Sequence, residues 1–207
     1  GKKMAFALVR KSLGDYQDFK LYREDGTEAI YSPYSILALG MKELEFRDDF
    51  PKQLRWVGYK CFSFDCLPTD HESYFETDKK RVLVTCGTHL KWEKERMVER
   101  AKKLSKLYPD YLFYVTLGEA SGLGNAPKRL AENLLLFDYL PYTDILDKID
   151  FAIHHAGTGI MMACIEHEIP SLILPQDYDQ FDNAVRAELA QVGLVARRKT
   201  DAEVQRL

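Results

Sequence analysis

The pattern of apolar and polar positions is regular from about residue 81 to the end of the chain. Short apolar runs occupy residues 82–85, 111–116, 134–137, 151–155, 171–174 and 194–196, and each has the length of a buried strand. Between them lie stretches with helical character, notably residues 91–108, 158–168 and 180–191. Apolar strands that alternate with helices predict an α/β fold, a doubly wound and Rossmann-like parallel sheet with helices on both faces. Such a sheet binds ligands beyond the carboxyl ends of its strands.

The first 80 residues have a different texture. They are irregular, rich in Tyr, Asp and Lys, and contain only short apolar pieces such as residues 36–39 and 55–59. Residues 59–80 have the composition of a linker, since charged residues and Pro68 dominate there. The pattern therefore predicts a boundary between an irregular first part and a regular second part.

Composition places the chain among ordinary globular proteins. Of its 207 residues, 46% are hydrophobic and 29% are charged. The net charge of −3 provides no basic field, so we expect no nucleic-acid partner. No apolar run approaches the roughly 18 residues of a membrane-spanning helix, and the first residues lack a signal-peptide pattern. These features lead us to expect a cytoplasmic protein without a transmembrane segment.

The four cysteines predict no zinc site. Cys86 and Cys164 occupy apolar positions of a strand and a helix, which is typical of buried, reduced thiols. Cys61 and Cys66 are too far apart for a C-x-x-C pair, and no second pair follows them.

A strand that ends in two histidines and a small-residue turn is the first candidate for chemistry. Residues 151–159 read Phe-Ala-Ile-His-His-Ala-Gly-Thr-Gly, and a predicted helix begins at the end of this run. A helix N-terminus presents free N–H groups, and small residues allow a diphosphate to approach the backbone. Strand alternation turns His155 and His154 to opposite faces, and we expect His155 to face the phosphate. A helix start that merely needs a flexible turn is the alternative interpretation.

A second polar group follows the next strand, at residues 175–180. Asp179 and Gln180 place a carboxylate and an amide side by side, a pair that suits the adjacent hydroxyls of a sugar ring. One alternative is a helix N-cap at Asp177 or Asp179. Another is a manganese-binding D-x-D pair formed by the same two aspartates, which the position after a strand of a doubly wound sheet disfavours.

These motifs together resemble the donor-binding signature of the UDP-glycosyltransferase superfamily. The resemblance rests on His155, Gly157 and Gly159, on Pro170 and Pro175, and on Asp179, Gln180 and Asn183 at their mutual spacing. Residues 139–146 are similar to the family's W-x-P-Q…L element, residues 84–88 to the turn after its first strand, and residues 55–58 to the segment before its interdomain linker. The resemblance covers about residues 36–198.

Membership in this family implies the C-terminal half of a GT-B fold and a set of residue roles. The diphosphate-binding residues are then Gly87, Thr88, His155, Gly157, Gly159 and Ile160. Tyr139 and Tyr142 are the nucleoside-binding residues, with Tyr139 stacked on the base, and Asp179 and Gln180 are the sugar-binding residues. No catalytic residue, metal or cofactor is expected in this chain, because the family's base lies in its N-terminal domain and a UDP-sugar is the donor substrate.

The sequence departs from the family pattern in three ways. Ile160 and Met161 stand where the family usually has Ser or Thr, and Ala163 stands where it usually has a Glu for the ribose hydroxyls. Tyr142 replaces the Gln that follows the proline. The nucleotide is therefore left open between UDP and TDP.

The resemblance also implies a domain organisation. Residues 1–58 are expected to be the tail of an N-terminal acceptor domain, residues 59–80 an interdomain linker, and residues 81–207 a donor-binding domain that is truncated at its end. The expected function is inverting, metal-independent transfer of a hexose from a UDP-sugar to a hydroxyl of a small or lipophilic acceptor, with this fragment inactive alone. The alternative is a stand-alone donor-binding subunit of a split glycosyltransferase, recruited by a membrane partner.

Overall fold

The computed structural model describes residues 7, 20, 22–61, 69–89, 91–197 and 200–206. It divides the chain into two compact units, residues 1–59 and 60–207. In the first unit, β1 (Ile36–Ala38) and β2 (Leu54–Trp56) form a two-stranded parallel sheet, and Lys42–Leu44 form a 3-10 turn. Leu44 is the one buried residue among the described residues of this unit. The described part of this unit therefore contains almost no buried core.

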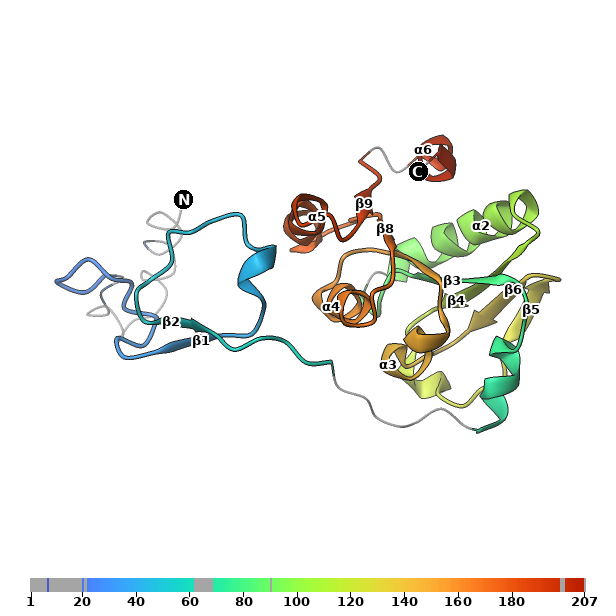
Figure 1. The fold of residues 1–207 in the computed structure, drawn as a ribbon, viewed down its shortest axis with the longest axis horizontal. Coiled ribbons are helices and arrows are strands. Elements are labelled where there is room, and N and C mark those ends of the chain that lie inside the picture. Colours follow the sequence, from blue (N-terminus) through green and yellow to red (C-terminus); the bar gives the residue numbers. More distant parts are fainter. Residues whose placement is uncertain are drawn as a thin grey trace. The chain divides into compact units, whose positions relative to one another are not determined.

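The second unit contains the alternation that the sequence predicts (Figure 1). Its strands are β3 (Lys80–Thr85), β4 (Tyr111–Thr116), β5 (Lys128–Ala131), β6 (Leu134–Phe137), β7 (Phe151–His154), β8 (Ser171–Ile173) and β9 (Leu194–Val195). Its α-helices are α2 (Lys91–Leu107), α3 (Tyr142–Ile145), α4 (Thr158–Glu166), α5 (Gln180–Leu189) and α6 (Asp201–Arg206), and its 3-10 helices are Thr69–Phe75, Ala120–Gly122 and Leu146–Lys148.

The seven strands form one sheet in the order β5-β6-β4-β3-β7-β8-β9. All neighbours are parallel except β5, which pairs antiparallel with β6. Without β5, the strands follow the chain order 3-2-1-4-5-6 of a doubly wound sheet, so the direction of winding reverses between β3 and β7. The predicted fold class is confirmed, and the reversal point is where such a sheet opens a crevice for a ligand.

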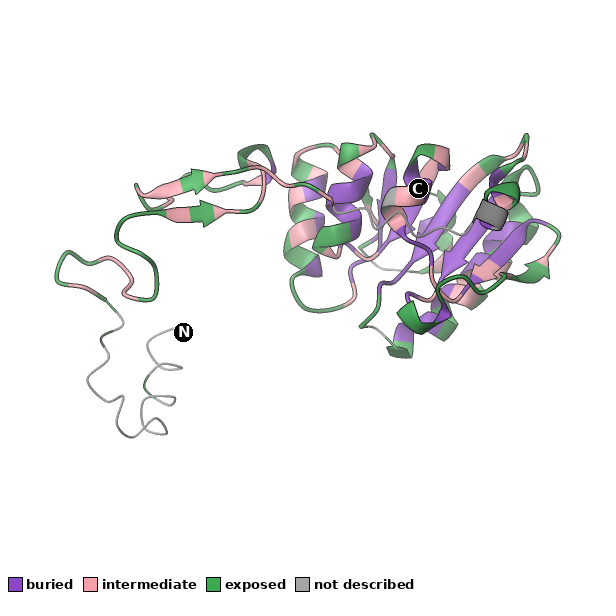
Figure 2. Ribbon diagram, turned by 90° about the horizontal axis from the view of Figure 1, so that it is seen from below, coloured by how far each residue is buried: buried purple, intermediate pink, exposed green. Residues whose placement is uncertain are grey.

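Two apolar clusters cover the faces of this sheet. On β3, Val82 and Val84 pack with α2 and with Val204 of α6, whereas Leu83 packs with residues of α3 and α4. This alternation is the period-2 geometry of a strand, and it places helices on both faces. Apart from the edge strands β5 and β9, the strands of this sheet are buried along most of their length (Figure 2). A sheet packed on both sides is a rigid support for the loops at its ends.

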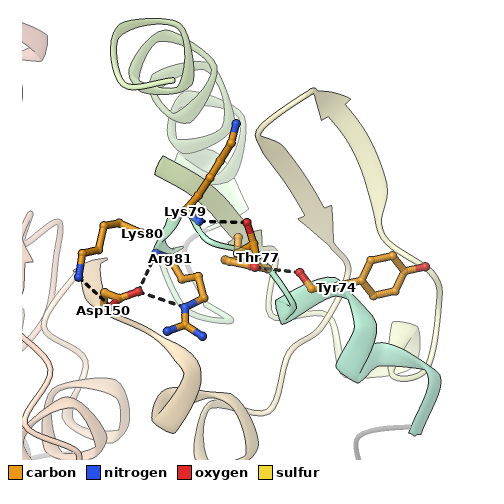
Figure 3. A network of polar contacts seen from close by, with 7 residues as sticks. Tyr74, Thr77, Lys79, Lys80, Arg81 and Asp150 are labelled. Carbon is orange, nitrogen blue, oxygen red and sulfur yellow. Dashed lines mark hydrogen bonds and ion pairs between the residues drawn. The ribbon is translucent and has the colours of Figure 1, made fainter. Parts of the chain in front are cut away.

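Polar contacts around Asp150 fix the amino-terminal edge of the sheet, by which we mean the end where its parallel strands begin (Figure 3). Its carboxylate accepts hydrogen bonds from the Arg81 backbone N–H at 2.9 Å and from Arg81 Nε at 3.1 Å, and Lys80 Nζ lies 3.5 Å away. Just before β6, the Asn133 Nδ2 donates to the carbonyls of Ser105, Tyr108 and Tyr111 at 2.8–3.1 Å. The side chains of Asp150 and Asn133 thus find their partners within the chain.

The structure adds elements that the hydrophobic pattern does not reveal. β5 is a largely exposed edge strand, and α3 and α6 are only 4 and 6 residues long. The division between the units falls at Tyr59, where the expected linker begins, but Phe75 of this linker segment is buried and stacks on Tyr114 with ring centroids 4.6 Å apart. None of the helices among the described residues has the length and apolar character to cross a membrane. Location in the cell stays a prediction.

Candidate functional site

A cavity of about 690 Å³ lies at the carboxyl ends of β3, β7 and β8. Its lining comes from three segments: residues 86–89 after β3, residues 155–160 around the start of α4, and residues 178–180 before and at the start of α5, together with Tyr142. The first two segments flank the point where the direction of winding reverses. The volume is in the usual range for small-molecule sites.

His155 is enclosed by two glycines. A Cβ atom placed on Gly87 would lie 2.7 Å from His155 Nε2, and one placed on Gly157 would lie 2.4 Å from the same atom. Gly87 also has a φ of +75°, which side chains rarely tolerate. The imidazole ring can occupy this place only because both neighbours lack a side chain.

The electrostatics of His155 follow from this enclosure. Burial lowers the pKa of His155 to about 4, against smaller opposing effects from the Thr85 carbonyl and the Asp179 carboxylate. Its Nδ1 is buried and has no hydrogen-bond partner among the described residues. The ring is therefore neutral at neutral pH.

Helix α4 begins at the edge of the cavity. Gly157 is its N-cap and supplies no side-chain hydrogen bond, and the first helical contact runs from the Met161 N–H to the Gly157 carbonyl. The N–H groups of Thr158, Gly159 and Ile160 consequently have no partner within the helix. A Cβ at Gly159 would meet no atom within 4 Å, so the backbone is openly accessible there. These donors and the positive end of the helix dipole suit an anion.

The turn after β3 is anchored by a short polar chain. The Thr85 hydroxyl accepts a hydrogen bond from the Gly87 N–H at 3.1 Å and lies 2.9 Å from the Tyr142 hydroxyl. Burial raises the pKa of Tyr142 to about 12, so the phenol stays protonated. The hydroxyl of Tyr142 thus supports the Gly87 turn, while its ring lines the cavity.

The two predicted sugar-binding residues differ in how many of their side-chain polar atoms already form hydrogen bonds within the chain. The Gln180 Oε1 accepts backbone hydrogen bonds from Gln176 and Asp177 at 2.9 and 3.2 Å, and the residue is buried. These bonds fix the loop before α5, whereas Asp179 at the N-cap of that helix makes no side-chain capping bond. Only the amide nitrogen of Gln180 remains for a ligand.

Asp179 is exposed and belongs to a polar cluster. The Asn183 Nδ2 lies 3.2 Å from its carboxylate, and the Thr158 hydroxyl lies 3.5 Å from it. The carboxylate thus joins the start of α5 to the start of α4 and keeps lone pairs directed to solvent. We expect it to accept hydrogen bonds from a hydroxylated ligand.

The cavity brings together every residue predicted for the diphosphate and the sugar, and Tyr142 of the nucleoside pair. Tyr139 does not line it. Their roles stay predictions, as does metal independence. Among the residues that the structure describes, no group of three or more His, Cys, Asp or Glu side chains is arranged to hold a metal ion. Asn183 belongs to the signature in the sequence but had no predicted role, and the structure places its amide between Ala156, Thr158 and Asp179.

Known proteins resemble the chain in the same region. Residues 114–206 match the family model described as erythromycin biosynthesis protein CIII-like, C-terminal domain. The chain is 27% identical over 172 residues to the UDP-glucuronosyltransferase 1A9 of Mus musculus, a match that covers 80% of this chain and 31% of that protein. It spans about a third of the length of such curated relatives.

Solved structures share the fold. The glycosyltransferase of kitacinnamycin superposes with a TM-score of 0.69 at 19% identity, covering 98% of this chain and 56% of the other. The spinosyn rhamnosyltransferase SpnG, solved in complex with thymidine diphosphate, gives a TM-score of 0.61 at 23% identity, covering 80% of this chain and 44% of the other. The family model, the relatives and the fold all support what the signature in the sequence indicates, namely the C-terminal domain of a GT-B glycosyltransferase of the UDP-glycosyltransferase superfamily.

Proposed function

We propose that this chain is the donor-binding half of a glycosyltransferase that transfers a hexose from a nucleoside-diphosphate sugar to a hydroxyl of a small or lipophilic acceptor. The observation that carries the proposal is the 690 Å³ cavity, which joins His155, the free N–H groups of α4 and Asp179 at the reversal point of the sheet. An anion site and a hydroxyl-binding site thus lie side by side, as a sugar diphosphate requires.

The chemistry of this half is the stabilisation of a leaving group. In the proposed reaction an acceptor hydroxyl attacks the anomeric carbon, a base outside this chain takes its proton, and the bond to the diphosphate oxygen breaks with inversion. Negative charge develops on the diphosphate, where the N-terminus of α4 and the imidazole of His155 can offset it. This is the task that a metal ion performs in other transferases, so we propose that the reaction needs none.

Calorimetry with nucleoside diphosphates tests the anion site. We expect the isolated chain to bind UDP or TDP weakly and to transfer no sugar. SpnG was solved with thymidine diphosphate, whereas the curated relatives are UDP-glucuronosyltransferases, so both nucleotides are needed. His155→Ala should weaken binding by one hydrogen bond to a charged group, roughly 1–3 kcal/mol, or about 5- to 150-fold. Robust transfer by this chain alone, or binding that is indifferent to His155→Ala, contradicts the proposal.

Asp179 separates sugar binding from nucleotide binding. Asp179→Ala should reduce affinity for a UDP-hexose by on the order of 2–3 kcal/mol and leave UDP nearly unchanged, because the carboxylate faces hydroxyls and not the diphosphate. Asp177→Ala is the matched control, since Asp177 does not line the cavity. A manganese site formed by both aspartates predicts equal losses in the two variants and tighter UDP binding with manganese, so that result rejects the assignment.

A further inference from the structure

The residue between His155 and α4 has an unusual backbone. Ala156 is fully buried and has a φ of 64°, in the left-handed region. Residues other than glycine adopt this conformation rarely, and it costs roughly 1–2 kcal/mol. The conformation directs the chain from the strand into the helix, so it determines where His155 and the N–H groups of α4 lie.

Both polar groups of the Ala156 residue are held by side chains. Its N–H donates to His154 Nδ1 at 3.0 Å, and its carbonyl accepts from Asn183 Nδ2 at 3.0 Å. His154 belongs to β7 and Asn183 to α5, so two elements fix the turn from opposite ends of one residue. We call this arrangement the Ala156 clamp.

His154 is suited to this contact and not to a ligand. Its side chain is 2% exposed and is absent from the lining of the 690 Å³ cavity. It lines a separate cavity of about 30 Å³ together with Thr85 and Glu93. Because Nδ1 accepts the Ala156 N–H, the ring proton resides on Nε2. Burial lowers the pKa of His154 to about 3, which keeps the ring neutral and Nδ1 available as an acceptor.

Asn183 extends the clamp to the sugar side of the cavity. The same amide group lies 3.4 Å from the Thr158 hydroxyl and 3.2 Å from the Asp179 carboxylate. A displacement of the Ala156 turn would therefore move the first residue of α4 and the proposed hydroxyl-binding carboxylate together.

We propose that His154 and Asn183 are positioning residues: by clamping the two ends of Ala156 they hold the left-handed turn that places His155 and the α4 N-terminus against the donor diphosphate. The inference rests on the proposed function for the identity of the ligand. It assigns a purpose to the first histidine of the pair, whose position on the strand otherwise indicates only a buried residue.

Substitutions that differ in one acceptor test the role of His154. His154→Asn keeps an acceptor at the position of Nδ1, because Oδ1 stands at the same distance from Cβ, whereas His154→Leu keeps a branched shape without an acceptor. His154→Gln moves the polar group to the Nε2 position, and it replaces the leucine variant if that variant does not fold. TDP and UDP affinities of the whole chain are measured by calorimetry, with thermal unfolding of each variant.

We expect the leucine and glutamine variants to lose about tenfold in TDP or UDP affinity, the equivalent of one buried hydrogen bond, and the asparagine variant to stay within about threefold of the original chain. Equal affinity in all variants overturns the proposal. So does a loss in the asparagine variant as large as in the others and in proportion to lost thermal stability, because that result shows packing of the ring and not its acceptor.

A double-mutant cycle and a ligand-free measurement complete the test. His154→Leu and Asn183→Ala act on one residue, so their effects on affinity should be less than additive, and additivity contradicts a shared clamp. Nitrogen NMR of the His154 ring should show Nδ1 unprotonated, and a protonated Nδ1 overturns the clamp even without ligand. If the original chain binds neither nucleotide while the ring shows the expected tautomer, the proposed function fails and the clamp stands as a feature of the turn.

Discussion

The two ends of the sheet satisfy their polar groups in opposite ways. At the amino-terminal edge, Asp150 and Asn133 are each hydrogen-bonded to several groups of the chain itself. At the carboxyl end, the His155 Nδ1 has no partner among the described residues, Ala156 has a left-handed backbone, and the first N–H groups of α4 are open. Strain and unsatisfied groups concentrate at the end of the sheet where we propose that a ligand binds, and the opposite edge supports them.

The largest loss of nucleotide affinity should come from filling the space beside His155. Gly157→Ala places a Cβ 2.4 Å from His155 Nε2, so the ring or the turn must move. We expect TDP and UDP affinity to fall by about 100-fold or more, since strain of several kcal/mol adds to the lost contact. The double variant with His155→Ala removes the clash, and its affinity should equal that of His155→Ala alone.

A matched substitution shows whether the clash is the cause. Gly159→Ala adds the same atom where nothing lies within 4 Å, so the NMR signals of the His155 ring should stay in place. If the Gly157→Ala variant binds nucleotide as tightly as the original chain, the described place of the ring is wrong.

The two ends of the sheet should lose their contributions to folding stability at different pH values as the pH is lowered. A histidine whose folded pKa is lowered binds fewer protons in the folded chain than in the unfolded chain. The free energy of unfolding therefore decreases as the pH is lowered from the unfolded pKa of 6.5 to the folded pKa, which is about 4 for His155 and about 3 for His154. The Arg81 N–H and guanidinium lower the pKa of Asp150 against the opposing effect of burial, so its contribution persists above 3.8 and is lost only at lower pH.

Urea unfolding between pH 7 and pH 3 measures this difference. By pH 4 the loss due to His155 should be on the order of 3 kcal/mol, and His155→Ala should reduce the slope between pH 6.5 and pH 4 by roughly half, because His154 still contributes there. Asp150→Asn should lower the whole curve by a constant amount above about pH 4 and change its slope only below that pH. A curve that is flat above pH 4 in the original chain contradicts the enclosure of the two histidines.

The smallest effect is expected at the amino-terminal edge. Asp150→Asn weakens a partly exposed ion pair but keeps an acceptor for the Arg81 N–H, so stability should fall by about 1 kcal/mol. Nucleotide affinity should not change, because this edge is the opposite end of the strands. A loss of affinity comparable to that of His155→Ala would show that the two ends do not act independently.

The strands and helices that could be predicted are those with a strong hydrophobic pattern in the sequence. β4 and β6 occupy the predicted residues, and β3 and β7 differ from the prediction by two residues and one, because their apolar runs are buried on both faces. The sequence pattern did not predict β5, because it is an exposed edge strand. It did not predict α6, because a six-residue helix has too few turns to show a clear hydrophobic period. The gathering of the predicted site residues around one cavity could be predicted, since it follows from the strand ends.

The contacts inside the site were less accessible to sequence reasoning. The bonds that Gln180 accepts from the loop before α5, and the bond that His154 accepts from Ala156, depend on backbone angles that no spacing encodes. The sequence identified the residue types that a ligand needs. It could not show which atoms of these residues already form hydrogen bonds within the chain.

The first unit has a practical consequence. Its β1 pairs only with β2 in the described residues, and Leu37 and Leu39 are 68% and 80% exposed. An open parallel edge with apolar side chains is a template for association between chains, and parallel sheets are normally covered on both faces. Preparations of the whole chain are therefore expected to self-associate as concentration rises. A chain that begins at Lys60 keeps every residue of the 690 Å³ cavity and avoids that edge, which makes it the better form for crystals and for binding measurements at high concentration.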